Sequence, residues 1–174
     1  NKISIIEISK VTIKSVKMEN IKAYCKNGKV MKVSLNGDLM DYKTEKEIIE
    51  EELTECKDLE NLIKKSIHEN IDFSEYIDLN SLKSTEFEKK VYIETMKIQR
   101  GEVKTYKEIG DNIGSKGYRA VGNALNKNPI PIIIPCHRVI GSNMKLTGFN
   151  GGINLKKEIL INEGIKVKND KVIL

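Results

Sequence analysis

Long apolar stretches are missing from this chain of 174 residues. No run of about 18 apolar residues occurs in it, which excludes a helix that crosses a membrane. The first residues also lack the pattern of a secretory signal peptide. We therefore expect a cytoplasmic protein with no membrane partner.

Cysteine and histidine are scarce. The three cysteines, Cys25, Cys56 and Cys136, are an odd number at wide spacing, which argues against a disulfide framework and for reduced thiols. Cys25, Cys56 and His68 would leave a tetrahedral zinc site one ligand short unless His137 joined them, and their spacing matches no zinc finger. We predict no metal and no other cofactor.

Acidic residues are absent between Asp111 and Glu158, although seven basic residues lie there. Residues 1–82 carry 13 Lys against 16 acidic residues, whereas residues 83–174 carry 17 Lys and Arg against 9. All three arginines, which suit fixed contacts to phosphates and bases, are in the second half. This half is expected to attract a polyanion, the alternative being an ordinary solvated lysine-rich surface.

The length and the change of charge favour two small lobes, 1–82 and 83–174. Residues 3–35 alternate apolar and polar side chains between turn signals, Asn27-Gly28 and later Asn36-Gly37, and are predicted to form antiparallel strands and hairpins.

Helices are expected after these strands. Thr44 and Glu47 fit a capping box that opens one helix, and a second is expected over 59–68. Residues 70–84 contain turn formers and weak periodicity, so the boundary between the lobes is placed there.

A further capping box, Thr85 with Glu88, opens the second lobe. The helix that follows is expected to end near Gly101. One of its faces carries Phe87, Val91, Thr95 and Met96.

Residues 105–127 predict two short helices joined by a turn. Thr105 and Glu108 cap a helix that reaches about Ile113, and a second helix runs over 118–127 after a turn rich in glycine. Such a helix-turn-helix is typical of DNA-binding proteins, although a helical hairpin that merely packs is the alternative. In the second helix Val121 and Leu125 are expected to face the core. The outer face is shared by Ala120, Asn123, Ala124 and Lys127. Arg119, at the start of the helix, is long enough to reach into a groove.

Cys136 stands next to His137 in the segment Pro135-Cys136-His137-Arg138. A cysteine is a strong nucleophile as its thiolate, and a neighbouring imidazole, a guanidinium or a helix N-terminus lowers its pKa. All three are candidates here. The alternative is a buried cysteine at the end of a core strand formed by residues 130–134.

The order and spacing of several motifs resemble those of the O6-alkylguanine-DNA alkyltransferase family, whose members are also called methylated-DNA–protein-cysteine methyltransferases. The matching residues are Tyr106, Arg119-Ala120-Val121-Gly122, Asn128-Pro129, Pro135-Cys136-His137-Arg138-Val139, Gly148-Phe149-Asn150-Gly151-Gly152 and Glu163-Gly164. The resemblance covers about residues 85–165. It implies a ribonuclease-H-like α/β N-terminal lobe, with a small sheet and helices, and a mainly α C-terminal domain with a winged-type helix-turn-helix.

The resemblance also implies a reaction and roles. The thiolate of Cys136 takes the alkyl group from O6-alkylguanine in double-stranded DNA and keeps it permanently. O4-alkylthymine stays open as a second substrate. His137 is the base acting through a water, Glu163 orients it, and Tyr106 gives a proton to the leaving purine and crowds the 3′ phosphate. Arg119 replaces the flipped nucleotide in the stack, because a stacked base cannot reach a buried sulfur.

The remaining implied roles concern DNA binding, the pocket and its support. The second helix enters the minor groove with Ala120, Gly122, Asn123 and Lys127. The substrate pocket comprises Val139, Phe149, Asn150 and Gly151, with Asn128 and Lys156 as structural supports. The protein is expected to act as a monomer that is cytoplasmic, and nucleoid-associated or nuclear when it engages DNA.

Two positions depart from the family pattern, and three other functions stay open. Tyr118 stands where a smaller residue is usual, and Phe149 where tyrosine is frequent. An alkyltransferase-like damage sensor would lack the nucleophile that Cys136 supplies. A plain helix-turn-helix regulator leaves Cys136 and Glu163 unexplained, and a cysteine hydrolase has no use for a basic helix.

Overall fold

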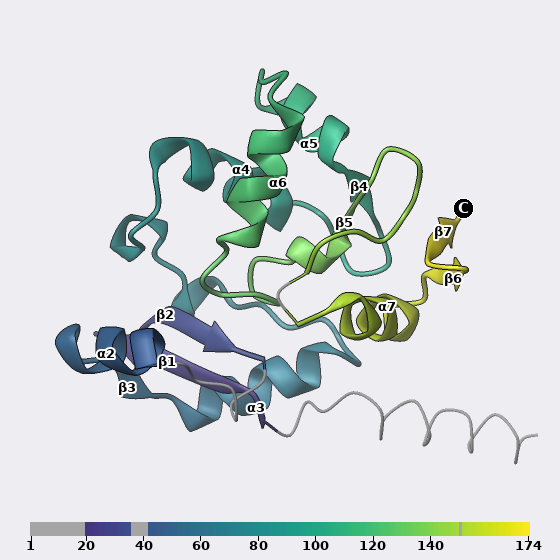
Figure 1. Cartoon of the computed structure of the whole chain (residues 1–174). Coiled ribbons are helices and arrows are strands. Elements are labelled where there is room, and N and C mark those ends of the chain that lie inside the picture. Colours follow the sequence, from purple (N-terminus) through teal and green to yellow (C-terminus); the bar gives the residue numbers. More distant parts are fainter. Residues whose placement is uncertain (1–19, 36–41, 150) are drawn as a thin grey trace, which may run out of the picture.

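The computed structural model describes residues 20–35, 42–149 and 151–174 (Figure 1). In chain order the elements are β1 (Lys22–Lys26), β2 (Lys29–Ser34), α2 (Tyr42–Glu50), β3 (Thr54–Glu55), α3 (Lys57–Ser66), the 3-10 turns η3 (Ser74–Tyr76) and η4 (Leu79–Ser81), α4 (Glu86–Met96), β4 (Lys104–Thr105), α5 (Tyr106–Asn112), α6 (Tyr118–Asn126), the 3-10 turn η5 (Cys136–Arg138), β5 (Val139–Ile140), α7 (Ile153–Asn162), β6 (Lys166–Lys168) and β7 (Lys171–Ile173). The chain is therefore mixed α/β, with small sheets and short helices, as predicted.

A three-stranded antiparallel sheet in the order β2-β1-β3 forms the first part. The predicted turn at Asn27-Gly28 joins β1 to β2, and both residues have positive φ, 51° and 75°, which asparagine and glycine tolerate. The strands predicted before residue 20 and the turn predicted at Asn36-Gly37 lie outside the described residues.

The prediction that Thr44 caps a helix is wrong, although the helix exists. α2 already begins at Tyr42, so Thr44 lies inside its first turn and its hydroxyl accepts a hydrogen bond from Lys32 Nζ at 3.3 Å. α3 begins two residues before the predicted Leu59 and ends at Ser66.

Both capping boxes predicted for the second part are confirmed. Thr85 and Glu88 bond each other's backbone N–H at the start of α4, and Thr105 and Glu108 do the same for α5. α4 ends at Met96 rather than near Gly101.

Beyond α4 the chain leaves the helix, and a residue distant in the sequence binds its backbone. The carbonyl of Ile98 accepts a hydrogen bond from Arg138 Nη1 at 2.8 Å. Gly101 has φ +89°, which places it outside any right-handed helix.

Helices α5 and α6 pack against each other and against α4, with α6 at the centre of Figure 1. Val121 and Leu125 are buried as predicted. Ala124 was expected on the outer face and is buried instead, because α6 packs against α4. Its carbonyl accepts a hydrogen bond from the Tyr92 hydroxyl of α4 at 2.9 Å.

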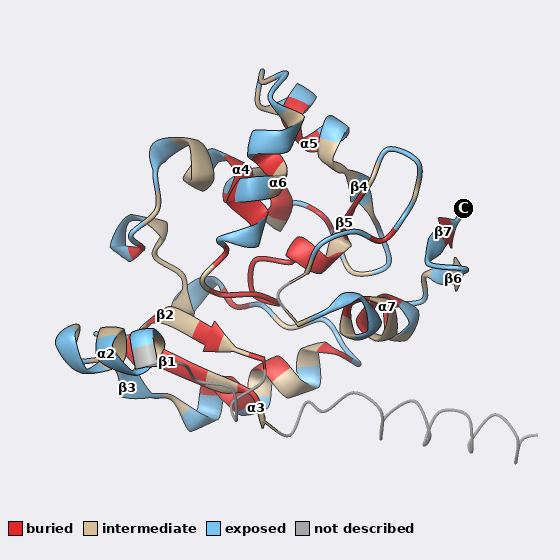
Figure 2. Ribbon diagram, in the orientation of Figure 1, coloured by how far each residue is buried: buried red, intermediate tan, exposed pale blue. Residues whose placement is uncertain are grey.

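The apolar run 130–134 is buried but does not form a strand. It makes a turn closed by an isolated bridge between Pro131 and Ile134, and Ile132 has a φ of 72°. Figure 2 shows this segment and η5 as a continuous buried stretch beneath α6. Cys136 therefore follows a tight buried turn, not a strand.

One large apolar cluster runs through both parts of the chain and includes Val33, Leu59, Val91 and Ile134. The backbone N–H of Val33 also donates to the Pro129 carbonyl at 2.9 Å. A second, smaller cluster of Ile140, Leu146, Leu160 and Val172 secures the C-terminal hairpin.

Candidate active site

Cys136 opens the 3-10 turn η5 and is almost enclosed, with 7% of its surface exposed. Parallel pairing of β4 with β5 sets Lys104 opposite Val139 and Thr105 opposite Ile140. Tyr106 directly follows β4 and so continues beside Gly141, whereas Cys136 precedes Val139 by three residues, at the other end of this pair. The two side chains are nevertheless near enough for the charge of Cys136 to contribute to the raised pKa of Tyr106.

Glu163, the residue that follows α7, forms a close hydrogen bond with His137. Its Oε1 atom lies 2.5 Å from His137 Nε2, and the side chains are 2% and 1% exposed. Burial alone would raise the pKa of Glu163, but the hydrogen bonds from His137 and Arg138, together with the charge of Arg138, lower it to about 2. Glu163 is therefore a carboxylate at neutral pH, and His137 presents Nε2–H to it.

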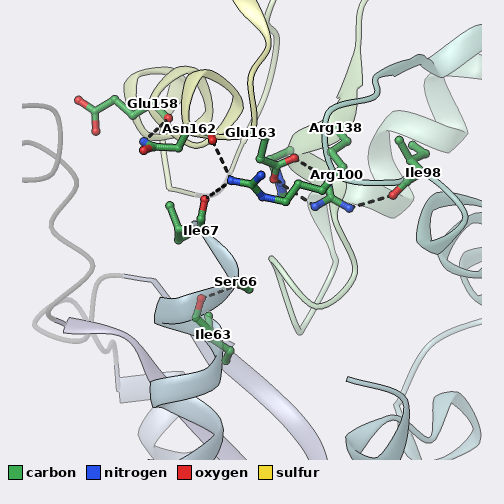
Figure 3. A network of polar contacts seen from close by, with 10 residues as sticks. Ile63, Ser66, Ile67, Ile98, Arg100, Arg138, Glu158, Asn162 and Glu163 are labelled. Atoms are coloured by element: carbon green, nitrogen blue, oxygen red, sulfur yellow. Dashed lines mark hydrogen bonds and ion pairs between the residues drawn. The ribbon is translucent and has the colours of Figure 1, made fainter. Parts of the chain in front are cut away.

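Arg138 is directed at Glu163 as well (Figure 3). Its Nε donates to Oε2 at 2.7 Å and its Nη2 to Oε1 at 3.2 Å, while Nη1 holds the Ile98 carbonyl. The guanidinium was a candidate for lowering the pKa of Cys136. It stabilises the carboxylate of Glu163 instead.

Burial raises the pKa of Cys136, and the Asn128 side chain and the charge of Lys156 counteract this only in part. Burial likewise lowers the pKa of His137 despite its contact with Glu163. Both side chains are therefore neutral near pH 7, and the thiol has to lose its proton during the reaction. His137 Nδ1 is buried and has no hydrogen-bond partner among the described residues, so it is the nitrogen available to take up a proton.

Lys156 is fully buried in α7 and connects two loops. Its Nζ donates to the carbonyls of Val139 at 2.6 Å and Thr147 at 2.8 Å, and lies 5.9 Å from the centre of the Tyr106 ring. Burial lowers the pKa of Lys156 to about 8. The Tyr106 hydroxyl donates to the Thr147 carbonyl at 3.3 Å, and burial raises its pKa.

Asn128 spans the buried turn that precedes Cys136. Its Nδ2 donates to the Ile134 carbonyl at 2.9 Å, and its Oδ1 accepts from the N–H of Ile130 at 3.0 Å. Because both bonds close the same loop, they support a bracing role.

A cleft of about 570 Å3 lies between helices α5 and α6 on one side and residues 141–148 on the other, and we call it the α6 cleft. Its lining includes Tyr106, Arg119, Gly122, Asn123, Asn143 and Thr147. Arg119, Ala120, Asn123 and Lys127 are all exposed, whereas Gly122 faces the Tyr106 ring. A cavity of similar size lies between β2, α2 and residues 126–131 and has Lys127 and Asn128 in its lining. Cys136 lines neither this cavity nor the α6 cleft.

The predicted pocket residues are only partly brought together. Phe149 packs edge-on against His137, with ring centres 6.5 Å apart, and the Val139 carbonyl is held by Lys156. A side chain at Gly151 would come within 2.5 Å of Leu155, so this glycine permits close packing. Asn150 lies outside the described residues.

Four contacts were not apparent from the sequence. Arg100 Nη2 donates to the carbonyls of Ile67 at 2.9 Å and Asn162 at 2.8 Å, and so joins the ends of α3 and α7 (Figure 3). The Tyr118 hydroxyl donates to Asp111 at 2.6 Å, and Lys107 lies over its ring at 5.7 Å. No short motif marks these long-range partners.

The described residues include no group of three or more His, Cys, Asp or Glu that could hold a metal, and no described helix is long and apolar enough to cross a membrane. All three cysteines are free. Burial and a hydrogen bond with Cys56 raise the pKa of Cys25 to about 12, which makes it a poor nucleophile.

Comparison with known proteins gives a consistent result. The family model "6-O-methylguanine DNA methyltransferase, DNA binding domain" matches residues 86–165. A methylated-DNA–protein-cysteine methyltransferase of Methanosarcina acetivorans is 59% identical over 61 residues, which are 34% of this chain and 39% of that protein. The chain thus matches about two-fifths of this curated relative.

Solved structures extend the similarity over more of the chain. An O6-methylguanine DNA methyltransferase from Methanococcus jannaschii is 30% identical, with 88% of this chain and 95% of that chain covered and a TM-score of 0.58. Mycobacterium tuberculosis OGT in complex with DNA is 40% identical over 60% of this chain and 63% of that chain, with a TM-score of 0.51.

Proposed function

The chain belongs to the O6-methylguanine DNA methyltransferase family, and we propose that it repairs DNA by moving the alkyl group of O6-alkylguanine onto Cys136, once and irreversibly. The observation that carries the proposal is the buried His137–Glu163 pair directly beside a buried cysteine. A nucleophile, a base and an orienting carboxylate are the three parts of a generalised catalytic triad.

The reaction follows from the positions of these groups. The Cys136 proton passes through a water to Nδ1 of His137, whose other nitrogen is held by Glu163. The thiolate attacks the alkyl carbon in line, a carbon–sulfur bond forms, and the carbon–oxygen bond breaks with its electron pair passing to the purine. Tyr106 supplies a proton to the purine and regains one through water from the protonated His137, so that the thiol proton is balanced by the proton on guanine. The thioether that remains is permanent, so each molecule acts once.

The base has to leave the duplex to reach this buried sulfur. We propose that α6 enters the minor groove, where exposed Ala120, Asn123 and Lys127 lie along the backbone and Gly122 permits close approach. Arg119 then fills the space of the flipped nucleotide, and Tyr106 crowds its 3′ phosphate. The similar tuberculosis protein was solved in complex with DNA, which supports DNA as the partner.

The guanine edge is expected to contact the Val139 carbonyl and the backbone of Asn150, with Phe149 and Gly151 completing the pocket. Lys156 and Asn128 hold these loops through the hydrogen bonds described above. The usual tyrosine hydroxyl is absent at Phe149, which bears on the tolerance of bulky alkyl groups.

The finer fold assignments belong to the same proposal. The sheet β2-β1-β3 with α2 and α3 is consistent with a ribonuclease-H-like lobe over residues 1–82. Helices α5 and α6 with the strand pair β4–β5 support a winged-type helix-turn-helix within residues 83–174. All the proposed groups come from one chain, which supports action as a monomer, and the free thiols fit a cytoplasmic or nucleoid location.

The test is incubation with a duplex that carries one O6-methylguanine, followed by intact mass and peptide mapping. We expect a gain of one methyl group on Cys136, none on Cys25 or Cys56, and no turnover beyond one equivalent. Cys136→Ser should bind the duplex and transfer nothing, since a serine hydroxyl is a far weaker nucleophile. Binding without a gain in mass would indicate a helix-turn-helix regulator or a damage sensor, and repeated turnover would indicate a hydrolase.

A further inference from the structure

Two lysines of the C-terminal hairpin stand in one row with a lysine of the loop that precedes α7. In the β6–β7 register Lys168 lies opposite Lys171, and an isolated antiparallel bridge places Lys145 opposite Lys171 on its other side. Residues directly opposite one another in a sheet project from the same face. Lys145, Lys171 and Lys168 therefore form one exposed row across three chain segments, which we call the lysine row.

The buried face of the hairpin determines this arrangement. Val167 and Val172 are paired across the strands and pack into the small apolar cluster beside Leu146. Hydrogen bonds from the Leu146 N–H to the Asp170 carbonyl and from the Val172 N–H to the Met144 carbonyl fix the hairpin against the preceding loop. Burial of the two valines thus sets the register of β6 against β7. The fold requires only that the three exposed positions of the row be polar, not that they be lysine.

Three lysines are an unfavourable choice for such positions. Like charges directly opposite in a sheet destabilise it. None of the three forms an ion pair within the part of the chain that the structure describes, and Asp170 in the hairpin turn lies 3.6 Å from Lys157 instead. The row therefore concentrates positive charge without internal compensation, which an external polyanion would relieve.

One end of the lysine row, Lys145, belongs to the loop 141–148 that forms one side of the α6 cleft. Lys145 is two residues beyond Asn143, which lines the cleft together with Arg119. At the usual strand spacing of about 4.8 Å the row is roughly 10 Å wide, a length over which duplex DNA presents several phosphates. Residues 166–174, which supply two of the three lysines, lie beyond the segment that the family model matches.

We propose that the lysine row binds the phosphate backbone of the same duplex whose base enters the active site, next to the stretch of minor groove occupied by α6. This inference rests on the proposed function. It adds contacts that carry no sequence information, as suits a protein that searches DNA for rare damage.

The test compares Lys168→Gln/Lys171→Gln with Lys57→Gln/Lys65→Gln, a control pair of exposed lysines on α3 outside the α6 cleft. Duplex affinity is measured over a series of salt concentrations for each protein. For the row variant we expect weaker binding to any sequence, and a slope of log affinity against log salt smaller by about 2, because each lost phosphate contact removes about one unit. Its melting temperature should stay the same or rise, since a like-charge contact is relieved. The control pair should leave the slope near that of the parent protein.

The inference would be overturned if the row variant and the control variant had the same slope of log affinity against log salt. The same samples are examined for alkyl transfer by intact mass, which separates the two proposals. If the parent protein transfers the alkyl group but the row variant has an unaltered salt slope, the lysine row is refuted and the proposed alkyl transfer stands. If the row variant has a reduced salt slope but the parent protein transfers nothing, the lysine row stands and the proposed alkyl transfer is refuted.

Discussion

Glu163 Oε1 lies 2.5 Å from His137 Nε2, and the two side chains are enclosed at the end of α7. This contact fixes which nitrogen of the imidazole carries the proton and leaves Nδ1 as the acceptor. Arg138 binds the same carboxylate from the other side. The carboxylate of Glu163 thus keeps its negative charge while it holds His137 in place.

Glu163→Gln should make the protein less stable in a way that depends on pH. The folded-state pKa of about 2 lies below the ordinary value of 4.5, so the stabilisation is fully present above about pH 4.5 and is lost as the pH falls toward 2. At about 1.4 kcal/mol per pKa unit, roughly 3 kcal/mol is at stake at pH 7. Urea unfolding of both proteins at pH 7 and pH 3 should show a difference that shrinks in acid, and an equal difference at both values would contradict the assignment.

Arg119→Ala should slow repair of duplex DNA much more than reaction with free O6-benzylguanine, which needs no flipping. Holding a base outside the stack offsets a cost of a few kcal/mol, so we expect a loss on the order of tenfold to hundredfold with duplex. Single-turnover rates on both substrates measure the ratio. Equal losses on the two would remove this role from Arg119.

Tyr106→Phe should slow both reactions, because protonation of the leaving purine belongs to the chemical step. General acids contribute about 10²- to 10⁴-fold. The phenylalanine keeps the ring beside Lys156 and loses only the hydroxyl that contacts Thr147. An unchanged rate with free O6-benzylguanine would show that Tyr106 is not the proton donor.

Alkylation should destabilise the protein that carries it out. The Cys136 thiol becomes a bulkier thioether in a site that is 7% exposed, and overpacking commonly costs about 1–3 kcal/mol. At about 2–4 °C per kcal/mol for a protein of this size, the reacted protein should melt several degrees lower, more so with benzyl than with methyl.

Matched melting curves and DNA affinities for reacted and unreacted protein check this. Hydrogen exchange should rise first around Cys136 and α6, and DNA binding should weaken. Unchanged stability together with unchanged affinity would show that the site accommodates its product without strain.

Arg100→Ala should loosen the junction of α3 and α7. The substitution leaves the carbonyls of Ile67 and Asn162 without their donor, at about 1–3 kcal/mol for each group that stays buried. Arg100→Lys keeps the charge at both helix ends and should recover part of the loss. Urea unfolding compares the three proteins, and equal stability of all of them would show that the bridge contributes nothing.

Features that depend on neighbours a few positions apart can be predicted from the amino-acid sequence alone. The boxes at Thr85 and Thr105 and the turn at Asn27-Gly28 are closed by side chains or backbone angles within four residues, so their residue types are sufficient to predict them. The order and spacing of the motifs around Cys136 are likewise sufficient to indicate the family, because they are properties of the sequence itself.

Contacts between distant groups depend on the tertiary fold. Residue patterns cannot show that β4 pairs with β5, that Arg138 turns to Glu163, or that Ala124 faces α4, because these follow from how whole helices pack. The start of α2 does not lie at Thr44, since a helix end is set by its three-dimensional surroundings as well as by its local sequence. The lysine row is the clearest case, because three residues from separate segments become one charged surface only when the valines behind them are buried.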